Sequence, residues 1–458
     1  MGNVKMNRVM MWFGVMAASA LAGIVPSAIP GIAAGASSVP QEIQADFDKH
    51  EYQHVLERIA GLDAQASGTP NVQRLKIRAL VKLNNPKEAL VEYGKLEVAL
   101  KQEDQTVLQE VALGFILVMV KDMREQMRGA AYTALKEIDP DEAAPYFEDG
   151  LSDASGPVRM LAVEGLSRSE KGRTSKRLRA AMDDQAALVK ARVVKAIART
   201  GDPDVVALVE SAAKDDLSAV RVAAYGALIR LGKKEVWNDL LQAARSPNPE
   251  DRADAIRVIA ELKDQRGASV MMEALTSKQP SVRAAAARGL GHLGRTEARE
   301  AIEPLLKDPV PGVRESAVGG LADLGGSESV EAIKRAMGDG NFAVRASAIA
   351  ALLHLGQPYS IVASAAQSLA RQNDMGMRAS VAYALGKATK VNAPGAISLL
   401  AGLTGDPLPG PKIVALRSLG HVGDRNLVPL LKDALHDAND AVRATAAGAL
   451  LHLLQQKK

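Results

Sequence analysis

The sequence predicts an all-α protein, an α-solenoid of about eleven two-helix repeats that follows a short helical region. One pattern of a basic, a small and a large apolar residue returns at a regular interval along most of the chain, as at positions 128, 159 and 190. A second apolar stripe follows each copy, and glycine, proline and aspartate separate the stripes. A chain of 458 residues suggests about three domains by length alone, but one repeated unit explains its uniform composition better.

Residues 1–36 have the layout of an export signal. Lys5 and Arg8 precede an apolar run over residues 10–25, and Ala34-Gly35-Ala36 supplies a small-residue cleavage site. We therefore expect a cleaved signal and an exported protein, periplasmic or extracellular. The alternative is an uncleaved anchor over residues 10–25, although this run is shorter than the about 20 residues that a bilayer span needs.

The composition excludes several kinds of chemistry. There are no cysteines, so disulfides, thiolate metal sites and thiol nucleophiles from this chain are ruled out. Aromatic residues make up 3% of the chain, too few for a stacking platform that binds single-stranded nucleic acid. The formal net charge of +4 is small for the length, so it does not by itself imply a polyanionic partner.

Residues 37–121 form the first predicted helical region. Val55-Leu56 and Ala89-Leu90 are 34 positions apart, as are His50 and Asn84. The segment 85–93 resembles the second helix of a tetratricopeptide unit, a repeat with a period of about 34 residues. The resemblance implies two such units, followed by a very apolar helix over residues 106–120 that is buried where the two arrays join.

Residues 122–458 form the predicted repeat array, which is aligned on a basic anchor. The anchors are Arg128, Arg159, Lys190, Arg221, Arg252, Arg283, Arg314, Arg345, Arg378, Lys412 and Arg443. The third position after each anchor is alanine or valine, and the seventh is leucine or isoleucine. Offsets of three and seven lie on one face of a helix, so each anchor begins an amphipathic helix.

A second helix and two turns complete each unit. Its apolar stripe includes Phe147, Leu178 and Val209, which stand at the same offset from the anchors at positions 128, 159 and 190. Glycines stand where the first helix is expected to end, as is common just past a helix C-terminus. These glycines are Gly201, Gly232, Gly294, Gly325, Gly356 and Gly423. Asn248-Pro249 and Asp374 stand where that helix is expected to begin.

An aspartate column accompanies the anchors. It lies six positions before them in eight of the eleven units. We interpret both columns as a structural ladder, in which loop carboxylates bind helix N-termini and the anchors of the same or adjacent units. Clear members of the ladder are Arg159, Arg221, Arg283, Arg314, Arg345, Arg443, Asp153, Asp215, Asp308, Asp339 and Asp437. A catalytic site needs convergent groups, whereas this column only repeats by translation, so no catalytic residue is assigned.

The segment 308–314, followed by Ala317 and Leu321, resembles a HEAT repeat of the short class named after phycobilisome lyases. The resemblance covers residues 122–454 and implies stacked helix pairs, which would form a curved rod on the order of 100 Å long at helix spacings of about 8–10 Å. It says little about function, because the family includes scaffolds, bilin lyases, a di-iron hydroxylase and DNA-binding members.

Two short motifs formally match catalytic signatures. Residues 50–54 read H-E-x-x-H, the zinc-protease pattern, but no glutamate between Arg58 and Lys87 can serve as a third ligand. The tetratricopeptide register also places His50 in a turn. Residues 289–294 read G-x-G-x-x-G, which binds dinucleotides only after a strand and before a helix, whereas these glycines close a helix. We expect neither metal nor cofactor at these motifs.

His292, His354, His421 and His452 each follow an anchor by nine positions. Other units have charged residues there, so we interpret the column as a polar edge. Equivalent rings in adjacent units are expected about 10 Å apart, too far to share one metal. Leucine or valine follows each histidine, which differs from the His-Glu pairs that the resemblance to the hydroxylases implies.

Three further features are candidates for binding. The segment 168–199 is strongly basic, and its candidate residues for an anionic partner are Arg168, Lys171, Arg173, Lys176, Arg177 and Arg179. Longer repeat intervals place extra residues within 388–394, where an enlarged loop could contact a partner. The last helix ends with Leu450, Leu451, Leu453 and Leu454, and no later helix follows to cover them, so this end could mediate dimerisation.

These features predict an exported, non-enzymatic scaffold or adaptor that binds protein partners through an extended helical surface. Two alternatives remain. One is an enzyme or enzyme accessory of the lyase or hydroxylase type that the HEAT resemblance includes, with a zinc-dependent activity as a variant. The other is a binder of anionic lipid or polyanion through the basic segment, although export disfavours nucleic acid. No metal and no cofactor are assigned.

Overall fold

The computed structural model describes residues 39–456, which are helical with no strands. The predicted signal over residues 1–36 lies outside this range. Within it, no helix is long and apolar enough to cross a bilayer.

The N-terminal region consists of six helices. They are α1 (Gln41–Asp48), α2 (Tyr52–Ala60), α3 (Ala64–Ser67), α4 (Pro70–Lys82), α5 (Pro86–Leu100) and α6 (Gln105–Val120). His50 and Asn84, equivalent positions of the sequence echo, both adopt positive φ, 64° and 61°, in the turns that precede α2 and α5. The echo therefore corresponds to two turns of similar shape. Val107, Val111 and Phe115 of α6 are buried, as expected for the helix that joins the two arrays.

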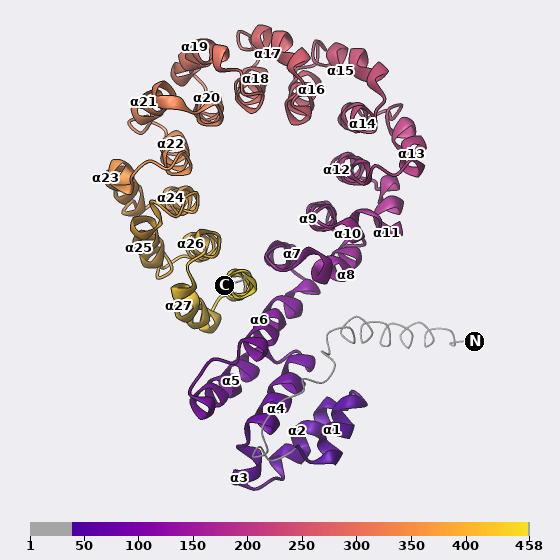
Figure 1. Cartoon of the computed structure of the whole chain (residues 1–458), viewed down its shortest axis with the longest axis vertical. Coiled ribbons are helices and arrows are strands. Elements are labelled where there is room, and N and C mark those ends of the chain that lie inside the picture. Colours follow the sequence, from indigo (N-terminus) through magenta and orange to yellow (C-terminus); the bar gives the residue numbers. More distant parts are fainter. Residues whose placement is uncertain (1–38, 457–458) are drawn as a thin grey trace, which may run out of the picture.

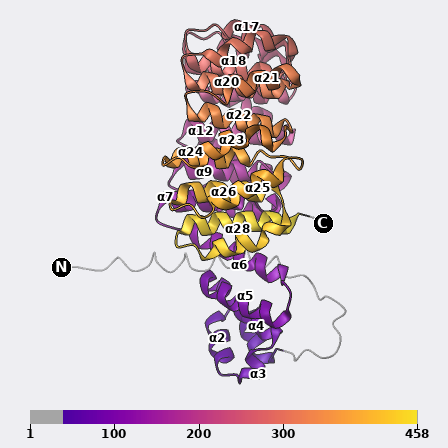
Figure 2. The same cartoon turned by 90° about the vertical axis from the view of Figure 1, so that its left-hand side faces the viewer.

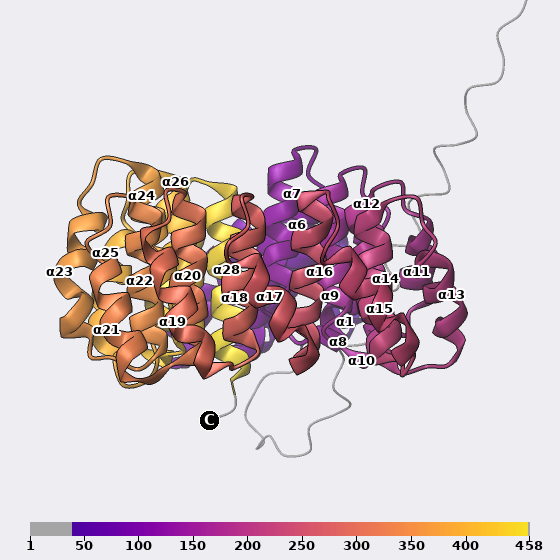
Figure 3. The same cartoon turned by 90° about the horizontal axis from the view of Figure 1, so that it is seen from above.

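The repeat array consists of an inner and an outer layer of helices (Figure 1). The inner helices carry the basic anchors and are α7 (Glu125–Leu135), α9 (Gly156–Leu166), α12 (Ala187–Ile197), α14 (Ser218–Arg230), α16 (Pro249–Leu262), α18 (Pro280–His292), α20 (Pro311–Leu324), α22 (Phe342–His354), α24 (Met375–Leu385), α26 (Pro409–Val422) and α28 (Asp440–Gln455). The inner helices run side by side, and most are seen nearly end-on in Figure 1 and lengthwise in Figure 3.

The outer layer follows the second apolar stripe. Its helices are α8 (Pro140–Gly150), α10 (Glu170–Arg173), α11 (Lys176–Ala180), α13 (Asp204–Ala212), α15 (Trp237–Ala243), α17 (Ala268–Ala274), α19 (Arg299–Ile302), α21 (Gly326–Ala336), α23 (Tyr359–Ala370), α25 (Ala393–Leu403) and α27 (Val428–Asp433). In the second unit the outer layer is divided between the short helices α10 and α11. The eleventh unit consists of its inner helix, α28, alone within the described residues.

The array is a closed ring and not the curved rod that the sequence suggested. The last inner helix, α28, packs against both α6 and α7, so the end of the array meets its beginning (Figures 1 and 2). The N-terminal helices α1–α5 project from this junction away from the ring (Figure 2). Stacking adds a small rotation at every repeat, and eleven repeats bring the ends together.

Closure also overturns the prediction of a dimerising C-terminal end. Leu450, Leu451, Leu453 and Leu454 are all buried, with at most 3% of each residue exposed. The covering helices are α6 and α7 of the same chain, of which α6 precedes the array and α7 begins it. These helices come from the opposite end of the array, a proximity that the order of helices along the chain does not reveal.

Helix boundaries follow local residue chemistry as predicted. The six glycines at the ends of inner helices all have positive φ, for example 68° at Gly201 and 79° at Gly423. The Asn248 side chain accepts a hydrogen bond from the Glu250 N–H at the start of α16, and Asp374 accepts one from the Met377 N–H at the start of α24. These contacts place the helix boundaries at equivalent positions, which keeps successive units in register.

The core is built from small and aliphatic side chains. Ala162 and Leu166 of α9, three and seven positions after the anchor, are fully buried, and the equivalent positions of the other units are buried too. Small residues let neighbouring inner helices approach closely: a Cβ added to Gly291 of α18 would lie 2.5 Å from the carbonyl oxygen of Gly320 in α20. Alanine and glycine columns thus fill much of a core that contains few aromatic residues.

Candidate functional site: the inner face of the ring

The inner helices are held in register by a ladder of ion pairs. In α9, Arg159 donates from Nε to Asp184 Oδ2 at 2.6 Å and from Nη2 to Asp184 Oδ1 at 2.8 Å. Its Nη1 donates to the Asp153 carbonyl oxygen at 2.9 Å. Each anchor of this kind therefore binds the backbone of its own unit and the carboxylate of the next unit, a charge-assisted contact with two parallel hydrogen bonds.

Six further ion pairs link an anchor to the aspartate of the next unit, four through two hydrogen bonds from an arginine and two through a single bond from a lysine. They are Arg128–Asp153, Lys190–Asp215, Arg283–Asp308, Arg314–Asp339, Arg378–Asp406 and Lys412–Asp437. The hydrogen bond from Arg283 lowers the pKa of Asp308 against the opposing effect of burial. The ladder therefore consists of ionised carboxylates at neutral pH.

The ladder is interrupted at three of the predicted members. Arg221 and Arg345 bind only carbonyl oxygens, those of residues 215–216 and 339–340. At the position where eight of the eleven units have aspartate, the unit after Arg221 has Ser246 and the unit after Arg345 has Gln372. Arg443 binds the carbonyl oxygens of residues 437 and 438, and because it belongs to the last unit its carboxylate partner comes from its own helix.

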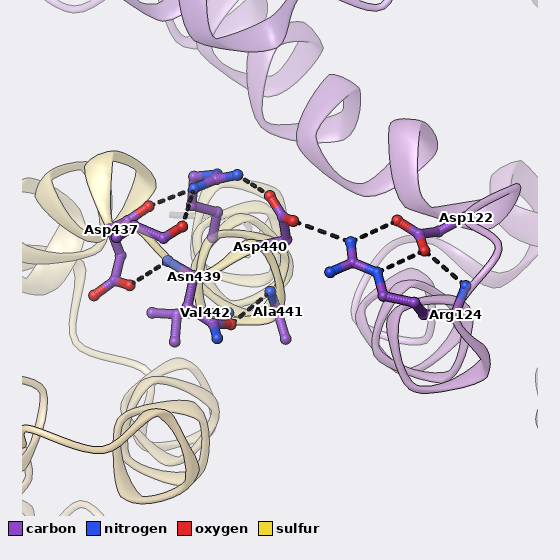
Figure 4. A network of polar contacts seen from close by, with 9 residues as sticks. Asp122, Arg124, Asp437, Asn439, Asp440, Ala441 and Val442 are labelled. Carbon is purple, nitrogen blue, oxygen red and sulfur yellow. Dashed lines mark hydrogen bonds and ion pairs between the residues drawn. The ribbon is translucent and has the colours of Figure 1, made fainter.

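At the ring junction the ladder continues by a longer route (Figure 4). Arg443 pairs with Asp440 on α28. Asp440 Oδ2 also accepts a hydrogen bond from Arg124 Nη2 at 3.2 Å, and Arg124 in turn binds Asp122 through Nε and Nη2 at 2.9 and 2.8 Å. The hydrogen bonds from Arg124 lower the pKa of Asp122 to about 2. Four alternating charges thus connect the last unit to the first.

Other contacts close the junction away from this network. Lys432 Nζ lies 2.7 Å from both carboxylate oxygens of Glu97 on α5, and the Gln105 side chain donates to the Leu454 carbonyl oxygen at 2.6 Å. A Cβ added to Gly448 of α28 would lie 3.1 Å from the Ala134 Cβ of α7. The junction is therefore packed as closely as neighbouring units within the array.

Two columns of positions lie on the side of the inner helices that faces the centre of the ring. They occupy the fifth and ninth positions after each anchor, and at about 100° per residue these positions lie opposite the buried third and seventh positions. We call them the inner columns. Lys195 Nζ lies 3.0 Å from Glu261 Oε1, although these residues are two units apart and α14 lies between them. Side chains two units apart can meet in this way only on the concave side of a curved array.

The inner columns contain more basic than acidic residues. The fifth positions are Thr133, Glu164, Lys195, Gly226, Arg257, Arg288, Gly319, Ala350, Tyr383, Arg417 and Gly448. The ninth positions are Glu137, Arg168, Arg199, Arg230, Glu261, His292, Asp323, His354, Lys387, His421 and His452. Eight lysines and arginines stand with four carboxylates, an excess of four positive charges. The inner columns therefore carry a net positive charge.

The histidine column is closer than the sequence suggested. The rings of His421 and His452, from adjacent units, have centroids only 5.8 Å apart, because side chains on the concave face converge. The expected spacing, taken from the helix axes, was nearly twice as large. His421 Nε2 lies 3.1 Å from Glu137 Oε2, and His452 Nδ1 lies 3.5 Å from the same oxygen.

Glu137 is the carboxylate that these two rings share. Burial alone would raise the pKa of Glu137, but the His421 hydrogen bond and nearby positive charges, including Arg417, make the net shift downward. Two imidazoles and one carboxylate do not make a metal centre here. Among residues 39–456, no group of three or more histidine or acidic residues is arranged to hold a metal ion.

The basic segment 168–199 does not form one patch, because it passes through both layers. Arg168 lies at the end of α9 in the inner columns and donates to the Lys136 carbonyl oxygen. Arg177 pairs with Asp149 and Arg179 with Asp202, at 2.8 and 2.5 Å. Arg173 is half-buried and binds the Ser167 carbonyl oxygen. Two of the six candidates, Lys171 and Lys176 of the outer layer, are exposed and have no carboxylate within 4.0 Å in the described part of the chain.

The two formal motifs are placed in unrelated structures. His50 lies in the turn before α2, where its Nδ1 is 2.8 Å from the Tyr52 hydroxyl, while His54 lies inside α2. Gly289 and Gly291 lie within α18 and Gly294 just after it. The helical register therefore separates the two imidazoles, and it gives the glycines a role in helix packing.

The enlarged segment 388–394 is tied to the preceding unit. The buried Asn392 side chain donates to the carbonyl oxygens of Leu353 and Gln357, both at 2.9 Å, and accepts from the Thr389 N–H. Val391 at its tip is 80% exposed. The extra residues thus form a braced turn with an exposed tip.

The fold and the inner face together define a closed, all-helical repeat protein. The HEAT repeats family matches residues 174–260, 237–322, 299–386 and 398–457, more than half of the chain, and the chain belongs to this family. No curated protein sequence matches it. Family membership accounts for the two-helix unit but not for closure of the ring.

Several solved structures are similar to this chain. Human deoxyhypusine hydroxylase in complex with glycerol has 17% identity and a TM-score of 0.28, over 77% of this chain and 98% of its own. YibA of E. coli has 18% identity and a TM-score of 0.34, over 65% and 97%. The karyopherin Kap121p has 13% identity and a TM-score of 0.38, over 90% of this chain and 55% of its own.

Proposed function

We propose that this protein is an exported, non-enzymatic scaffold that binds protein partners through the helical surface of its ring. The observation that carries the proposal is the arrangement of the inner face. Eleven helices present the same two columns of side chains in register, held by paired and buried anchors such as Arg159 and Arg378. A long surface of this kind suits a partner that makes many weak contacts, whereas catalysis needs a few groups that converge.

The proposal of export rests on the sequence of residues 1–36, with its two basic residues, apolar run and small-residue cleavage site. Mass spectrometry of the protein from its native cell would give the mature N-terminus. A start near residue 37 supports a cleaved signal, and an intact N-terminus supports an anchor over residues 10–25.

Crosslinking in the cell, followed by mass spectrometry, tests the scaffold proposal directly. We expect reproducible crosslinks from residues of the repeat array to one protein or a small set. The proposal fails if no protein is crosslinked reproducibly, or if purified protein turns over a small substrate with stoichiometric zinc, iron or manganese bound.

A second candidate function is contact with an anionic membrane surface through the outer layer. It is favoured by the exposed Lys171 and Lys176, which lie near each other in sequence on α10 and α11. Co-sedimentation with vesicles that contain anionic lipid, compared with neutral vesicles, tests it. Binding that is lost in K171E/K176E supports this function, and equal recovery with both vesicle types contradicts it.

A further inference from the structure

The ring encloses a basic lumen whose charges are not used by the fold. Five cations of the inner columns have no carboxylate oxygen within 4.0 Å in the part of the chain that the structure describes: Arg168, Arg199, Arg230, Lys387 and Arg417. The anchors of the same five units differ, since four of them are paired with aspartates and have at least three quarters of the side chain buried. The need for a stable fold therefore explains why the anchors are charged, but it does not explain the five unpaired cations of the inner columns.

The contacts that these five cations do make leave their charge available. Arg230 donates to the Glu261 carbonyl oxygen at 3.2 Å, and Lys387 Nζ lies 4.8 Å from the centre of the Tyr383 ring. Carbonyl oxygens and aromatic rings orient a cation without neutralising it. Acidic side chains in the same columns are already engaged, as Glu261 is with Lys195 and Glu137 with His421. The net potential in the lumen is thus positive.

The dimensions of the ring set what can enter it. Eleven inner helices at spacings of about 8–10 Å give a ring of helix axes about 30 Å across. Subtracting the radius of the helices with their side chains, about 5–6 Å on each side, leaves a bore of about 20 Å. A single helix about 10–12 Å wide fits within this bore, as does an extended chain. A folded domain of ordinary size does not.

We infer that the lumen binds an acidic segment of a partner protein, inserted into the ring as one helix or extended strand. Five unpaired cations, four of them arginines, suit carboxylates, because a guanidinium binds a carboxylate through two parallel hydrogen bonds. Single-stranded nucleic acid is a poorer match, because its bases stack on the rings of phenylalanine, tyrosine or tryptophan. Of these three residue types, the twenty-two positions of the inner columns contain only Tyr383. This inference rests on the proposed function and specifies the partner.

A labelled peptide tests the lumen directly. The probe is a fluorescein-labelled 20-residue poly-L-glutamate, titrated with the purified full-length chain and followed by fluorescence anisotropy. The lumen variant is R199E/R230E, and the matched control is K214E/K234E, which makes the same change in net charge at two exposed lysines beside the outer helices α13 and α15. We expect the lumen variant to weaken binding at least about tenfold and the control less than about twofold. A thermal melt of each variant establishes that it is folded, and R199Q/R230Q replaces the first variant if that one is not.

The remaining outcomes overturn the inference. Equal weakening in the two variants would mean that net charge and not the lumen attracts the peptide, and unchanged binding in the lumen variant would exclude the inner columns. A 20-nucleotide single strand bound more tightly than poly-glutamate, and lost in R199E/R230E, would make the lumen a site for a different polyanion.

The lumen and the scaffold proposal can fail separately. Cellular crosslinks confined to the outer helices would keep the scaffold and reject the lumen. Poly-glutamate binding that depends on Arg199 and Arg230, with no protein crosslinked in the cell, would keep the lumen chemistry and reject the scaffold.

Discussion

Closure of the ring can be tested with a single engineered disulfide. Ala134 of α7 and Gly448 of α28 are 314 positions apart in sequence, yet a Cβ on Gly448 would lie 3.1 Å from the Ala134 Cβ. Disulfides have Cβ–Cβ distances of about 3.5–4.5 Å, so a small shift of either helix accommodates one in A134C/G448C. The natural chain has no cysteine, so no other thiol competes with the pair.

The size of the effect follows from the length of the loop that the disulfide closes. For about 314 residues the chain-entropy model gives about 5–6 kcal/mol of stabilisation, before any strain in the folded ring is subtracted. We expect the oxidised monomer to migrate differently from the reduced monomer in a non-reducing gel. Mass spectrometry should identify the linked peptides, and the midpoint of urea unfolding should be higher in the oxidised form.

A second pair of cysteines is a control for disulfides that form by chance collision and not because the ring is closed. Gly312 at the start of α20 lies on the far side of the ring from α7, with nothing within 4 Å of an added Cβ. A134C/G312C should therefore form no intramolecular disulfide. The closed ring is refuted if A134C/G448C also fails to link within one chain, or links only between chains, under the same oxidising conditions.

Three further comparisons test the contacts that maintain the ring. Because the pKa of Glu137 is lowered in the folded protein, its ionised form stabilises the fold at neutral pH, and this stabilisation is lost as the pH falls through the folded pKa. In urea unfolding, the stability advantage of the wild type over E137Q should therefore shrink between about pH 7 and pH 3. A difference that stays constant with pH would contradict this. Arg159→Ala leaves the largely buried Asp184 without its partner and should lower the free energy of unfolding by about 3–5 kcal/mol. Arg221→Ala loses only bonds to carbonyl oxygens and should lower it by about 1 kcal/mol. Equal losses of stability in chemical denaturation would contradict a stabilising role of the ion-pair ladder. In Gly291→Ala the added methyl group meets the Gly320 carbonyl oxygen, which should lower the stability by about 1–3 kcal/mol. In Gly312→Ala the methyl group has open space, so the change should be neutral or stabilising. The reverse order of melting temperatures would contradict the close approach of α18 and α20.

Features that depend on one repeat could be predicted from the sequence. The glycine that ends an inner helix, the Asn248 cap and the buried third and seventh positions are all determined within a single repeat unit, so their periodicity is visible. The contact from each anchor to the next aspartate spans only 25 positions in most units, and both columns were therefore recognisable as partners.

Features that depend on the sum of all repeats could not be predicted. Whether the ends meet depends on small rotations at every junction between units, which are set by packing details such as the contact of Gly291 with Gly320. The sequence therefore suggested a rod and left the last leucines uncovered. The distance between the His421 and His452 rings was overestimated for the same reason, because a spacing taken from helix axes ignores the convergence of side chains on a concave face. The basic segment appeared as one feature because sequence distance does not distinguish the inner from the outer layer.

Closure has a consequence for how this protein can change. An open solenoid can gain or lose a unit, because each unit contacts only its neighbours and the terminal units are capped separately. Here the free side of α7 and the free side of α28 cap each other, with α6 completing the junction. One unit more or fewer would move the two sides apart or force them past each other, and every junction would have to adopt a new angle. The number of repeats is therefore itself constrained, as the number of strands is in a closed β-barrel.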